Sequence, residues 1–209
     1  MRLYVHPASY NSSRALAAAF ETGTSVEIVI VDLLRGEQRG PDYLRLNPMG
    51  RVPLLEDGAL RLPESAAIMW TFAERSGRLL PENHAGRAEA LRWISWDLAH
   101  LGRAHDIILF EQVIKGLFQL GSPDASAIEA ARSAGDAAAA VLEEALTGQP
   151  FLVSGGASVA DLFVAGTVRS AAGLGVPWAS APHTARWLAA VEDLPGCRAA
   201  RARLAVERA

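Results

Sequence analysis

Glu64 and Ser65 stand where the residue pattern changes from strand-like to helical. Pro63 ends a short apolar run, and a helical pattern begins directly after it. We therefore expect the pair at a helix N-terminus, where main-chain N–H groups have no helical partner and the helix dipole favours an anion. A serine hydroxyl at such a position adds one more hydrogen-bond donor. The chemistry that these residues favour is the binding of a negatively charged ligand group.

Two apolar runs lie just before this point, at residues 52–55 and 59–62, and Asp57-Gly58 stands between them. Asp-Gly between apolar runs is a strong local signal for a tight β-hairpin. Pro53 falls at the entry of the first strand, where a strand tolerates proline. The stretch therefore predicts a hairpin that leads directly into a helix.

This stretch resembles the glutathione-binding segment of the glutathione transferase superfamily. The matching residues are 47–53, 55–58 and 62–68, which read NPMGRVP, LEDG and LPESAAI. The resemblance extends over essentially the whole chain, but it is specific only in this segment and loose in the later part. A plain hairpin followed by a capped helix remains the structural alternative.

The resemblance implies a role for each residue of the segment. In the family the proline at Pro53 is cis, and the main chain of Val52 pairs with the cysteinyl part of glutathione, as an exposed strand edge can do. Glu64 and Ser65 hold the γ-glutamyl end, through its ammonium and its carboxylate. Arg51, together with Arg35 and Gln38, lies where the family often contacts the glycyl carboxylate. A solvated loop is the alternative for these three residues.

The resemblance also implies that the reaction depends on ionising the thiol of glutathione. A free thiol titrates near pH ~8.5, so little thiolate exists at neutral pH. A hydrogen bond donated to the sulfur from the start of the first helix favours the thiolate. The family places this donor in the loop after the first strand.

Five side chains of that loop could donate the hydrogen bond: Ser9, Tyr10, Asn11, Ser12 and Ser13. The spacing from Ser9 to Arg14 resembles serine-type members, so we predict that Ser9 is the catalytic donor. Asn11 and Ser12 stay open as catalytic alternatives, and Tyr10 ranks behind them. A turn or a helix cap is the structural alternative for each, and for Ser13 it is the favoured one.

A second set of residues is predicted to border the pocket for the electrophilic substrate. His100, Arg103 and Ile107 share one face of an expected helix through their three-, four- and seven-residue offsets. In the family this face borders the electrophile pocket, and we place Tyr10 there as well. Trp93 and Trp96 on the same helix are assigned to packing.

The first part of the chain predicts a small mixed sheet. Strand patterns cover 2–6 and 26–31, and helical patterns cover 14–21, 42–46 and 64–75 around the hairpin. The order β-α-β-α-β-β-α is the thioredoxin-like arrangement, which the family resemblance also implies. We predict a glutathione-binding domain over residues 1–77, and residues 76–81 read as a linker.

The strand signal disappears after the linker, so residues 86–209 are predicted to form an all-helical domain. The expected helices cover 82–115, a segment that starts at Ser122-Pro123-Asp124, a segment that starts at Ser158, 182–191 and 196–206. Ser158-x-x-Asp161 is a capping-box pattern, and we expect Asp161 to be buried and structural.

Composition narrows the class of protein. The net charge is −3, which argues against nucleic-acid binding, and no apolar run approaches the ~18 residues of a membrane span. The one cysteine, Cys197, allows no internal disulfide, and the five histidines show no metal-ligand spacing. With no signal peptide visible, we expect a cytoplasmic protein without a metal.

These observations together predict a glutathione transferase that conjugates glutathione, its co-substrate, to small hydrophobic electrophiles. The family resemblance implies a homodimer. Two alternatives stay open: a glutathione-dependent peroxidase or disulfide reductase on the same fold, and a non-catalytic interaction module.

Overall fold

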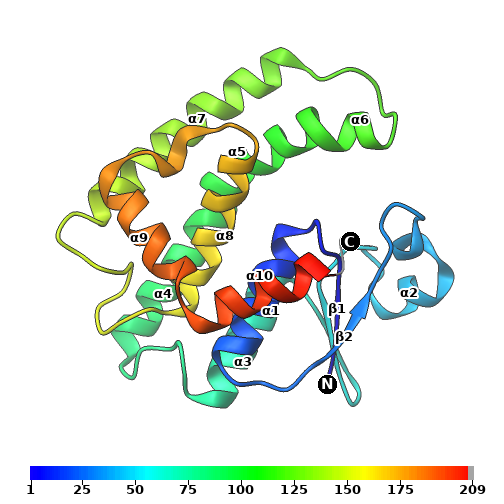
Figure 1. Cartoon of the computed structure of the whole chain (residues 1–209), viewed down its shortest axis with the longest axis horizontal. Helices are drawn as coiled ribbons and strands as arrows, with labels where there is room; N and C mark the ends of the chain where they lie inside the picture. The colour runs from blue at the N-terminus through cyan, green and yellow to red at the C-terminus, as the bar shows by residue number, and fades with distance from the viewer. Residues whose placement is uncertain (207–209) are drawn as a thin grey trace. The chain divides into compact units, whose positions relative to one another are not determined.

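The computed structural model describes residues 1–206, which form two compact units (Figure 1). The first unit contains residues 1–80 and also the C-terminal helix α10 (Pro195–Val206). The second unit spans Pro81–Val191. The predicted division at residues 77 and 86 stays a prediction, and the last three residues of its second domain, 207–209, lie outside the described residues.

The first unit has the predicted order of elements. They are β1 (Arg2–Val5), α1 (Tyr10–Glu21), β2 (Glu27–Ile30), η1 (Glu37–Arg39), α2 (Pro41–Leu46), β3 (Leu54–Asp57), β4 (Leu60–Pro63) and α3 (Ser65–Ser76). The strands form one sheet in the order β2-β1-β3-β4, with β1 and β2 parallel and the other pairs antiparallel. The thioredoxin-like fold predicted from the sequence is confirmed.

The two faces of β1 have different surroundings because side chains alternate along a strand. Leu3 and Val5 are completely buried, as is Leu55 on β3. Helices α1 and α3 pack against each other and against this sheet. Arg2 and Tyr4 point to the other face, where the rings of Tyr4 and Tyr43 meet edge to face at 5.9 Å.

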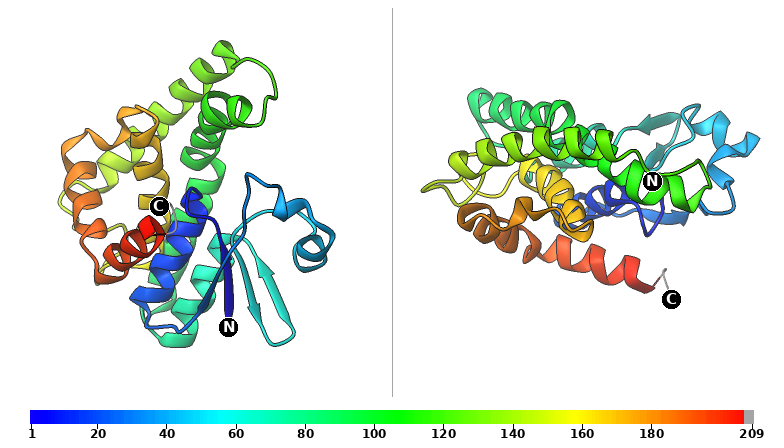
Figure 2. Two further views of the ribbon diagram at one scale, coloured as in Figure 1. Left: turned by 45° about the vertical axis from the view of Figure 1, so that its right-hand side comes forward. Right: turned by 90° about the horizontal axis from the view of Figure 1, so that it is seen from above.

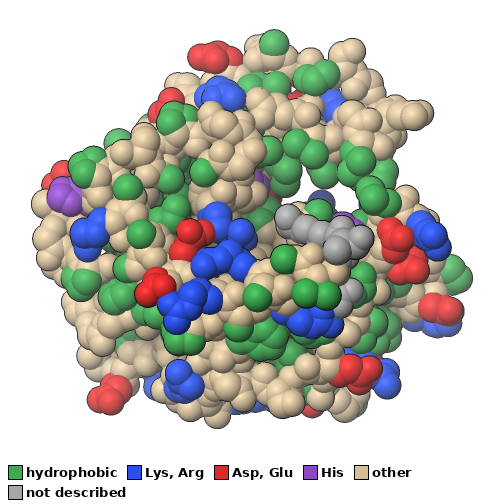
Figure 3. All heavy atoms as spheres, in the orientation of Figure 1, with side chains coloured by type: hydrophobic (Ala, Val, Ile, Leu, Met, Phe, Trp, Pro, Cys, Tyr) green, Lys and Arg blue, Asp and Glu red, His purple; other side chains and the backbone are tan. Residues whose placement is uncertain are grey.

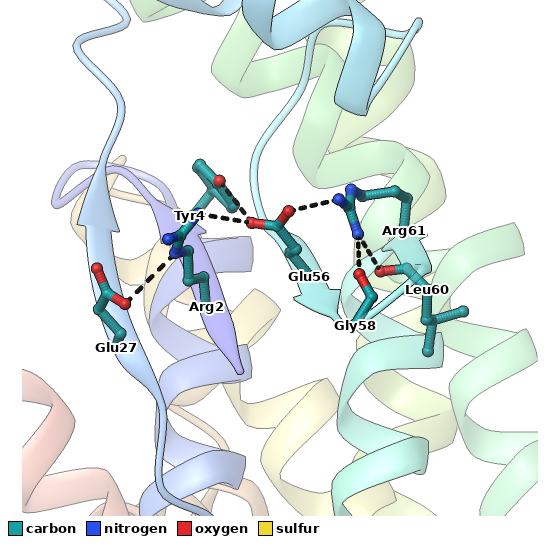
Figure 4. A network of polar contacts seen from close by, with 7 residues as sticks. All are labelled: Arg2, Tyr4, Glu27, Glu56, Gly58, Leu60 and Arg61. Carbon is teal, nitrogen blue, oxygen red and sulfur yellow. Dashed lines mark hydrogen bonds and ion pairs between the residues drawn. The ribbon is translucent and has the colours of Figure 1, made fainter.

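A row of alternating charges crosses that second face (Figure 4). The register aligns Glu27, Arg2, Glu56 and Arg61 across the four strands. Neighbours in the row are paired at 3.4 Å (Arg2–Glu27), 3.4 Å (Arg2–Glu56) and 2.5 Å (Arg61–Glu56). The Tyr4 hydroxyl also donates to Glu56 at 2.8 Å. Glu56 is thus the central acceptor that joins three strands.

The acid sensitivity of the sheet should follow from Glu56. The hydrogen bond from Tyr4, assisted by Arg61 and Arg2, lowers the pKa of Glu56 below its ordinary value of 4.5. A carboxyl with a lowered folded-state pKa stabilises the fold above its unfolded-state pKa, and this contribution is lost as the pH falls through the folded-state pKa. We therefore expect Glu56→Gln to lose less stability than the wild type between pH ~7 and ~3.5. Urea unfolding at a series of pH values measures this, and equal losses would contradict it.

The first helix is longer than the sequence predicted. It begins at Tyr10 rather than Arg14, because Ser9 is the N-cap and its oxygen accepts a hydrogen bond from the N–H of Ser12. Residues 10–13, expected in a loop, are therefore the first turn of α1. A cap can open a helix at polar residues that pattern alone assigns to a loop.

Helix α10 packs against α1, as two views show (Figure 2). The contact is close because Gly196 has no side chain: a Cβ there would lie 2.4 Å from the main-chain nitrogen of Glu21. The N–H of Gly196 also donates to the Glu21 carboxylate at 2.6 Å. Lys and Arg side chains gather over α10 in the space-filling view (Figure 3). On this helix Arg201 pairs with Glu192 at 3.9 Å.

Because this contact is close, a substitution of Gly196 tests how α10 packs against α1. Gly196→Ala would force α10 away from α1, and overpacking of this kind costs about 1–3 kcal/mol. We expect a lower urea midpoint for this variant. Gly173→Ala is the matched control, because a Cβ there meets nothing within 4 Å. If the two variants unfold at the same urea concentration, α10 is not held as closely as the structure indicates.

The second unit is helical throughout its regular elements, as predicted. Its elements are α4 (His84–Ala99), α5 (Leu101–Leu109), η2 (Phe110–Ile114, a π-helix), α6 (Lys115–Leu117), α7 (Ala125–Ala145), α8 (Val159–Gly173), η3 (Pro177–Ala179) and α9 (Pro182–Glu192). The Trp93 and Trp96 rings pack edge to face at 5.1 Å, as expected for packing residues.

Two helix boundaries differ from the prediction. The single helix expected over 82–115 is broken at His100, beside a close approach of Gly102 to the Asp97 carbonyl. The prediction also started the next helix at Ser122-Pro123-Asp124. Instead Asp124 is the N-cap, because its carboxylate accepts from the N–H groups of Ser126 and Ala127, and α7 starts at Ala125.

The predicted capping box is confirmed at the start of α8. Asp161 is completely buried, and one oxygen accepts from the N–H and the hydroxyl of Ser158 at 2.8 and 2.7 Å. The other accepts from the N–H of Leu152 and the indole of Trp187, both at 2.8 Å. Burial raises the pKa of Asp161, and these four hydrogen bonds oppose that effect. Asp161 is thus a structural acceptor that ties a loop and α9 to α8.

Candidate functional site

The register of the sheet brings three predicted site segments to one end. Tyr4 pairs with Leu54, and Leu54 pairs with Pro63. β4 therefore ends in the row where β3 begins, and β1 ends one residue beyond that row, at Val5. The segments that adjoin this row are the Ser9 loop, Val52-Pro53 and Glu64-Ser65. These three segments, which are far apart in the sequence, thus meet at one end of the sheet.

Ser9 and Ser12 differ in their exposure. Ser9 is half-buried, and its hydroxyl oxygen accepts from the Ser12 N–H at 3.2 Å. Its hydroxyl hydrogen is not donated to any group within residues 1–206. Ser12 is completely buried, and its oxygen accepts from the N–H of His6 at 3.1 Å. Ser9 therefore has a hydrogen to donate at the positive end of α1, whereas Ser12 is enclosed by protein.

Two side chains hold the main chain just before β3 in place. The Tyr43 hydroxyl and the Asn47 amide both donate to the Arg51 carbonyl at 2.8 Å. Burial raises the pKa of Tyr43, so it remains a neutral donor. The Arg51 side chain is exposed. This bracing fixes the approach to the next peptide.

That next residue, Val52, presents its own main chain. Its N–H and C=O make no hydrogen bond to other groups within the described part of the chain. The Val52–Pro53 bond is cis, as the family resemblance implied, and Pro53 is buried. Unpaired main-chain groups at the start of a strand can pair with an extended ligand.

Glu64 has an unusual backbone at the start of α3. Its φ is 70° and its ψ 114°, and its exposed side chain makes no capping hydrogen bond. A positive φ is unfavourable for a residue with a side chain, and such strain often accompanies functional sites. Ser65 is the first residue of α3 and is buried. The strained turn leaves the first N–H groups of α3 without a side-chain cap.

Sequence reasoning missed a residue that contacts Ser65. Arg14 is buried on α1, and its Nε donates to the Ser65 hydroxyl oxygen at 3.1 Å. The Ser65 hydroxyl donates to the side-chain oxygen of Asn11, Oδ1, at 3.1 Å, and Arg14 also donates to that oxygen. The guanidinium lies 5.0 Å from the centre of the Tyr10 ring. Asn11 and Tyr10, predicted as site residues, thus belong to one cluster with Ser65.

Tyr4 lies on β1, in the row of the sheet that the predicted site segments adjoin. Its hydroxyl donates to Glu56 on the sheet face, and burial, followed by this hydrogen bond, raises its pKa. A tyrosine that is engaged in this way and reluctant to ionise is suited to packing.

Three of the four predicted electrophile residues lie in the second unit, whereas Tyr10 lies on α1 in the first. Arg103 is exposed and Ile107 half-buried, both on α5. His100 is exposed at the break between α4 and α5, and its ring lies 6.4 Å from that of Trp96. The three residues therefore do not share one continuous helix, and their role as a pocket stays a prediction.

The histidine, cysteine and acidic side chains of residues 1–206 form no group of three or more that could hold a metal ion. No helix in this part of the chain is both long and apolar enough to cross a membrane.

Two family models match the chain. The model of the glutathione S-transferase N-terminal domain matches residues 1–70, and that of the glutathione S-transferase C-terminal domain matches residues 125–203. A probable glutathione S-transferase from Oryza sativa is 34% identical over 194 residues, which cover 90% of this chain and 89% of the relative.

Solved structures give the same result. A possible glutathione S-transferase from Rhodopseudomonas palustris is 33% identical, with a TM-score of 0.83 over 93% of this chain and 87% of that one. Glutathione S-transferase-I bound with lactoylglutathione is 28% identical, with a TM-score of 0.82 over 96% of this chain and 98% of that one.

Proposed function

The chain belongs to the glutathione S-transferase family, and we propose that it ionises the thiol of glutathione and conjugates it to a small hydrophobic electrophile. The observation that carries this proposal is the meeting of three segments at one end of the sheet. Within residues 1–206, each segment offers hydrogen-bond groups without a protein partner: the hydroxyl hydrogen of Ser9, the N–H and C=O of Val52, and the first N–H groups of α3, which have no side-chain cap.

Glutathione carries three groups that match this arrangement. Its γ-glutamyl carboxylate would bind the N–H groups and the hydroxyl at Ser65, while Glu64 pairs with the ammonium. Its cysteinyl main chain would pair with Val52, which extends the sheet by one strand-like segment. The exposed Arg51 is available to the glycyl carboxylate. These assignments use the positive end of α3 for the negative end of the ligand.

The cysteinyl contact at Val52 would place the sulfur toward the start of α1, where Ser9 is the N-cap. Ser9 can donate its hydroxyl hydrogen to the sulfur while its oxygen still accepts from Ser12. The thiolate is the nucleophile that attacks the electrophile and displaces its leaving group or adds to it. We place Ser9 ahead of the buried Ser12. The side-chain oxygen of Asn11 accepts from Arg14 and Ser65, which leaves its amide N–H groups as the alternative donor.

Four further features belong to the proposal. The electrophile would contact Tyr10, His100, Arg103 and Ile107. The protein would act without a metal, in the cytoplasm and as a homodimer. Leu91 and Leu98 are 53% and 55% exposed one heptad apart on α4, which is consistent with burial against a second copy.

The first test is binding. Calorimetry should detect glutathione binding by the wild type, and Ser65→Ala should weaken it about tenfold, since hydrogen bonds to charged groups contribute about 1.5–3 kcal/mol. Ser76→Ala is the control, because Ser76 lies at the opposite end of α3. A wild type that binds no glutathione at millimolar concentration would favour a non-catalytic interaction module.

The second test concerns Ser9. Ser9→Gly keeps most of the capping stability, at a cost of a few tenths of a kcal/mol, but removes the donor. We expect the pKa of bound glutathione to rise by about one to two units, and conjugation at pH ~7 to fall about ten- to hundredfold. Part of the rate should return at pH ~9, and Ser9→Thr should keep activity.

Thiolate absorbance and initial rates measure both effects. Asn11→Ala and Ser12→Ala serve as comparisons. If either of them shows the pH-dependent loss while Ser9→Gly does not, the donor is that neighbour. A normal conjugation rate in all three variants would exclude a side-chain donor among these residues.

A further inference from the structure

We propose that Arg14 is a positioning residue for the ligand carboxylate, and that it acts through the hydroxyl of Ser65. This inference rests on the proposed function, because it concerns the γ-glutamyl carboxylate of glutathione. Arg14 would not touch the ligand. It would fix the Ser65 oxygen and make the hydroxyl a stronger donor toward that carboxylate.

Three contacts help to hold the guanidinium in position. Arg14 is 5% exposed, and its Nε lies 3.1 Å from the Ser65 oxygen. Its Nη2 donates to the Asn11 carbonyl, and the Tyr10 ring lies 5.0 Å away. Asn11 and Tyr10 precede Arg14 by three and four residues, so all three side chains share one face of α1. The contact with Ser65 is therefore made from a rigid, preformed platform.

A guanidinium that donates to a hydroxyl oxygen has two consequences. It occupies one lone pair of that oxygen, so the oxygen stays in place while the hydrogen can still rotate. It also polarises the O–H bond, because chains of hydrogen bonds strengthen one another in a low-dielectric setting. A Ser65 that accepts from Arg14 is thus a better donor than an isolated serine.

In this structure the Ser65 hydroxyl donates its hydrogen to the side-chain oxygen of Asn11 at 3.1 Å. A carboxylate at the start of α3 is charged and therefore the stronger acceptor. Rotation about the Cβ–Oγ bond would redirect the hydrogen to the ligand while Arg14 keeps its hold on the oxygen. Asn11 thus keeps Ser65 hydrogen-bonded until the ligand binds.

A double-mutant cycle separates this role from a general structural one. Arg14→Lys keeps the charge but cannot donate from a planar fork to Ser65 and Asn11 together. The cycle combines Arg14→Lys with Ser65→Ala, and calorimetry measures the binding of two probes. The first probe is glutathione. The second is 4-aminobutanoyl-cysteinyl-glycine, which lacks only the γ-glutamyl carboxylate.

We expect Arg14→Lys to weaken glutathione binding about tenfold in the wild-type background and less than about twofold in the Ser65→Ala background. Binding of the probe without the carboxylate should change less than about twofold. Arg78→Lys is the matched control and should bind both probes as the wild type does. Arg78 lies in the same unit and pairs with Glu21 at 3.8 Å.

Equal losses for both probes, or additive losses in the cycle, would overturn the role of Arg14 but leave the proposed function intact. A wild type that binds no glutathione would overturn the proposed function itself. If Arg14→Lys does not fold, the wild type still gives an answer. Its assigned Arg14 Nε–H resonance should move when glutathione is added and stay in place with the probe that lacks the carboxylate, and the same shift with both probes would reject the inference.

Discussion

The strand register is the constraint on which the site depends. The row Tyr4–Leu54–Pro63 places the start of β3, the end of β4 and, one residue further on, the end of β1 at the same end of the sheet. Because side chains alternate, the same register buries Leu3 and Val5 under the helices and aligns Arg2 with Glu56 on the opposite face. A slip of one residue would reverse both faces of a strand. The apolar core and the charged row therefore select the one alignment in which the Ser9 loop, the Val52 peptide and the start of α3 meet.

The site itself consists of local features that weaken a fold. A positive φ at Glu64, an unpaired peptide at Val52 and an uncapped start of α3 each cost free energy in an isolated protein. Such features persist only where the surroundings hold them. Tyr43 and Asn47 hold the Arg51 carbonyl beside Val52, and the contacts of Ser65 with α1 hold the start of α3. A ligand that supplies the missing partners gains binding energy without having to reorganise the protein.

The sequence predicted the features that are local and missed those that arise from packing. The hairpin, the helix start at Glu64-Ser65 and the capping box at Ser158 are each determined by residues close together in the sequence. The break at His100 is not, because the residue pattern continues through it while Asp97 and Gly102 approach each other in space. The charged row could not be predicted without the register. The start of α1 was placed too late because polar residues after Ser9 read as a loop, although the Ser9 cap opens a helix there.

The spacing of Arg14 from Ser9 singles this residue out but predicts none of its contacts. Burial against Ser65 depends on how α3 packs on α1, and no pattern within one helix contains that information. A buried guanidinium must be hydrogen-bonded to be tolerated. The groups that surround it, Asn11 and Ser65, are themselves polar residues at the edge of the site, so the requirement to satisfy Arg14 and the requirement to orient Ser65 are met by the same contacts.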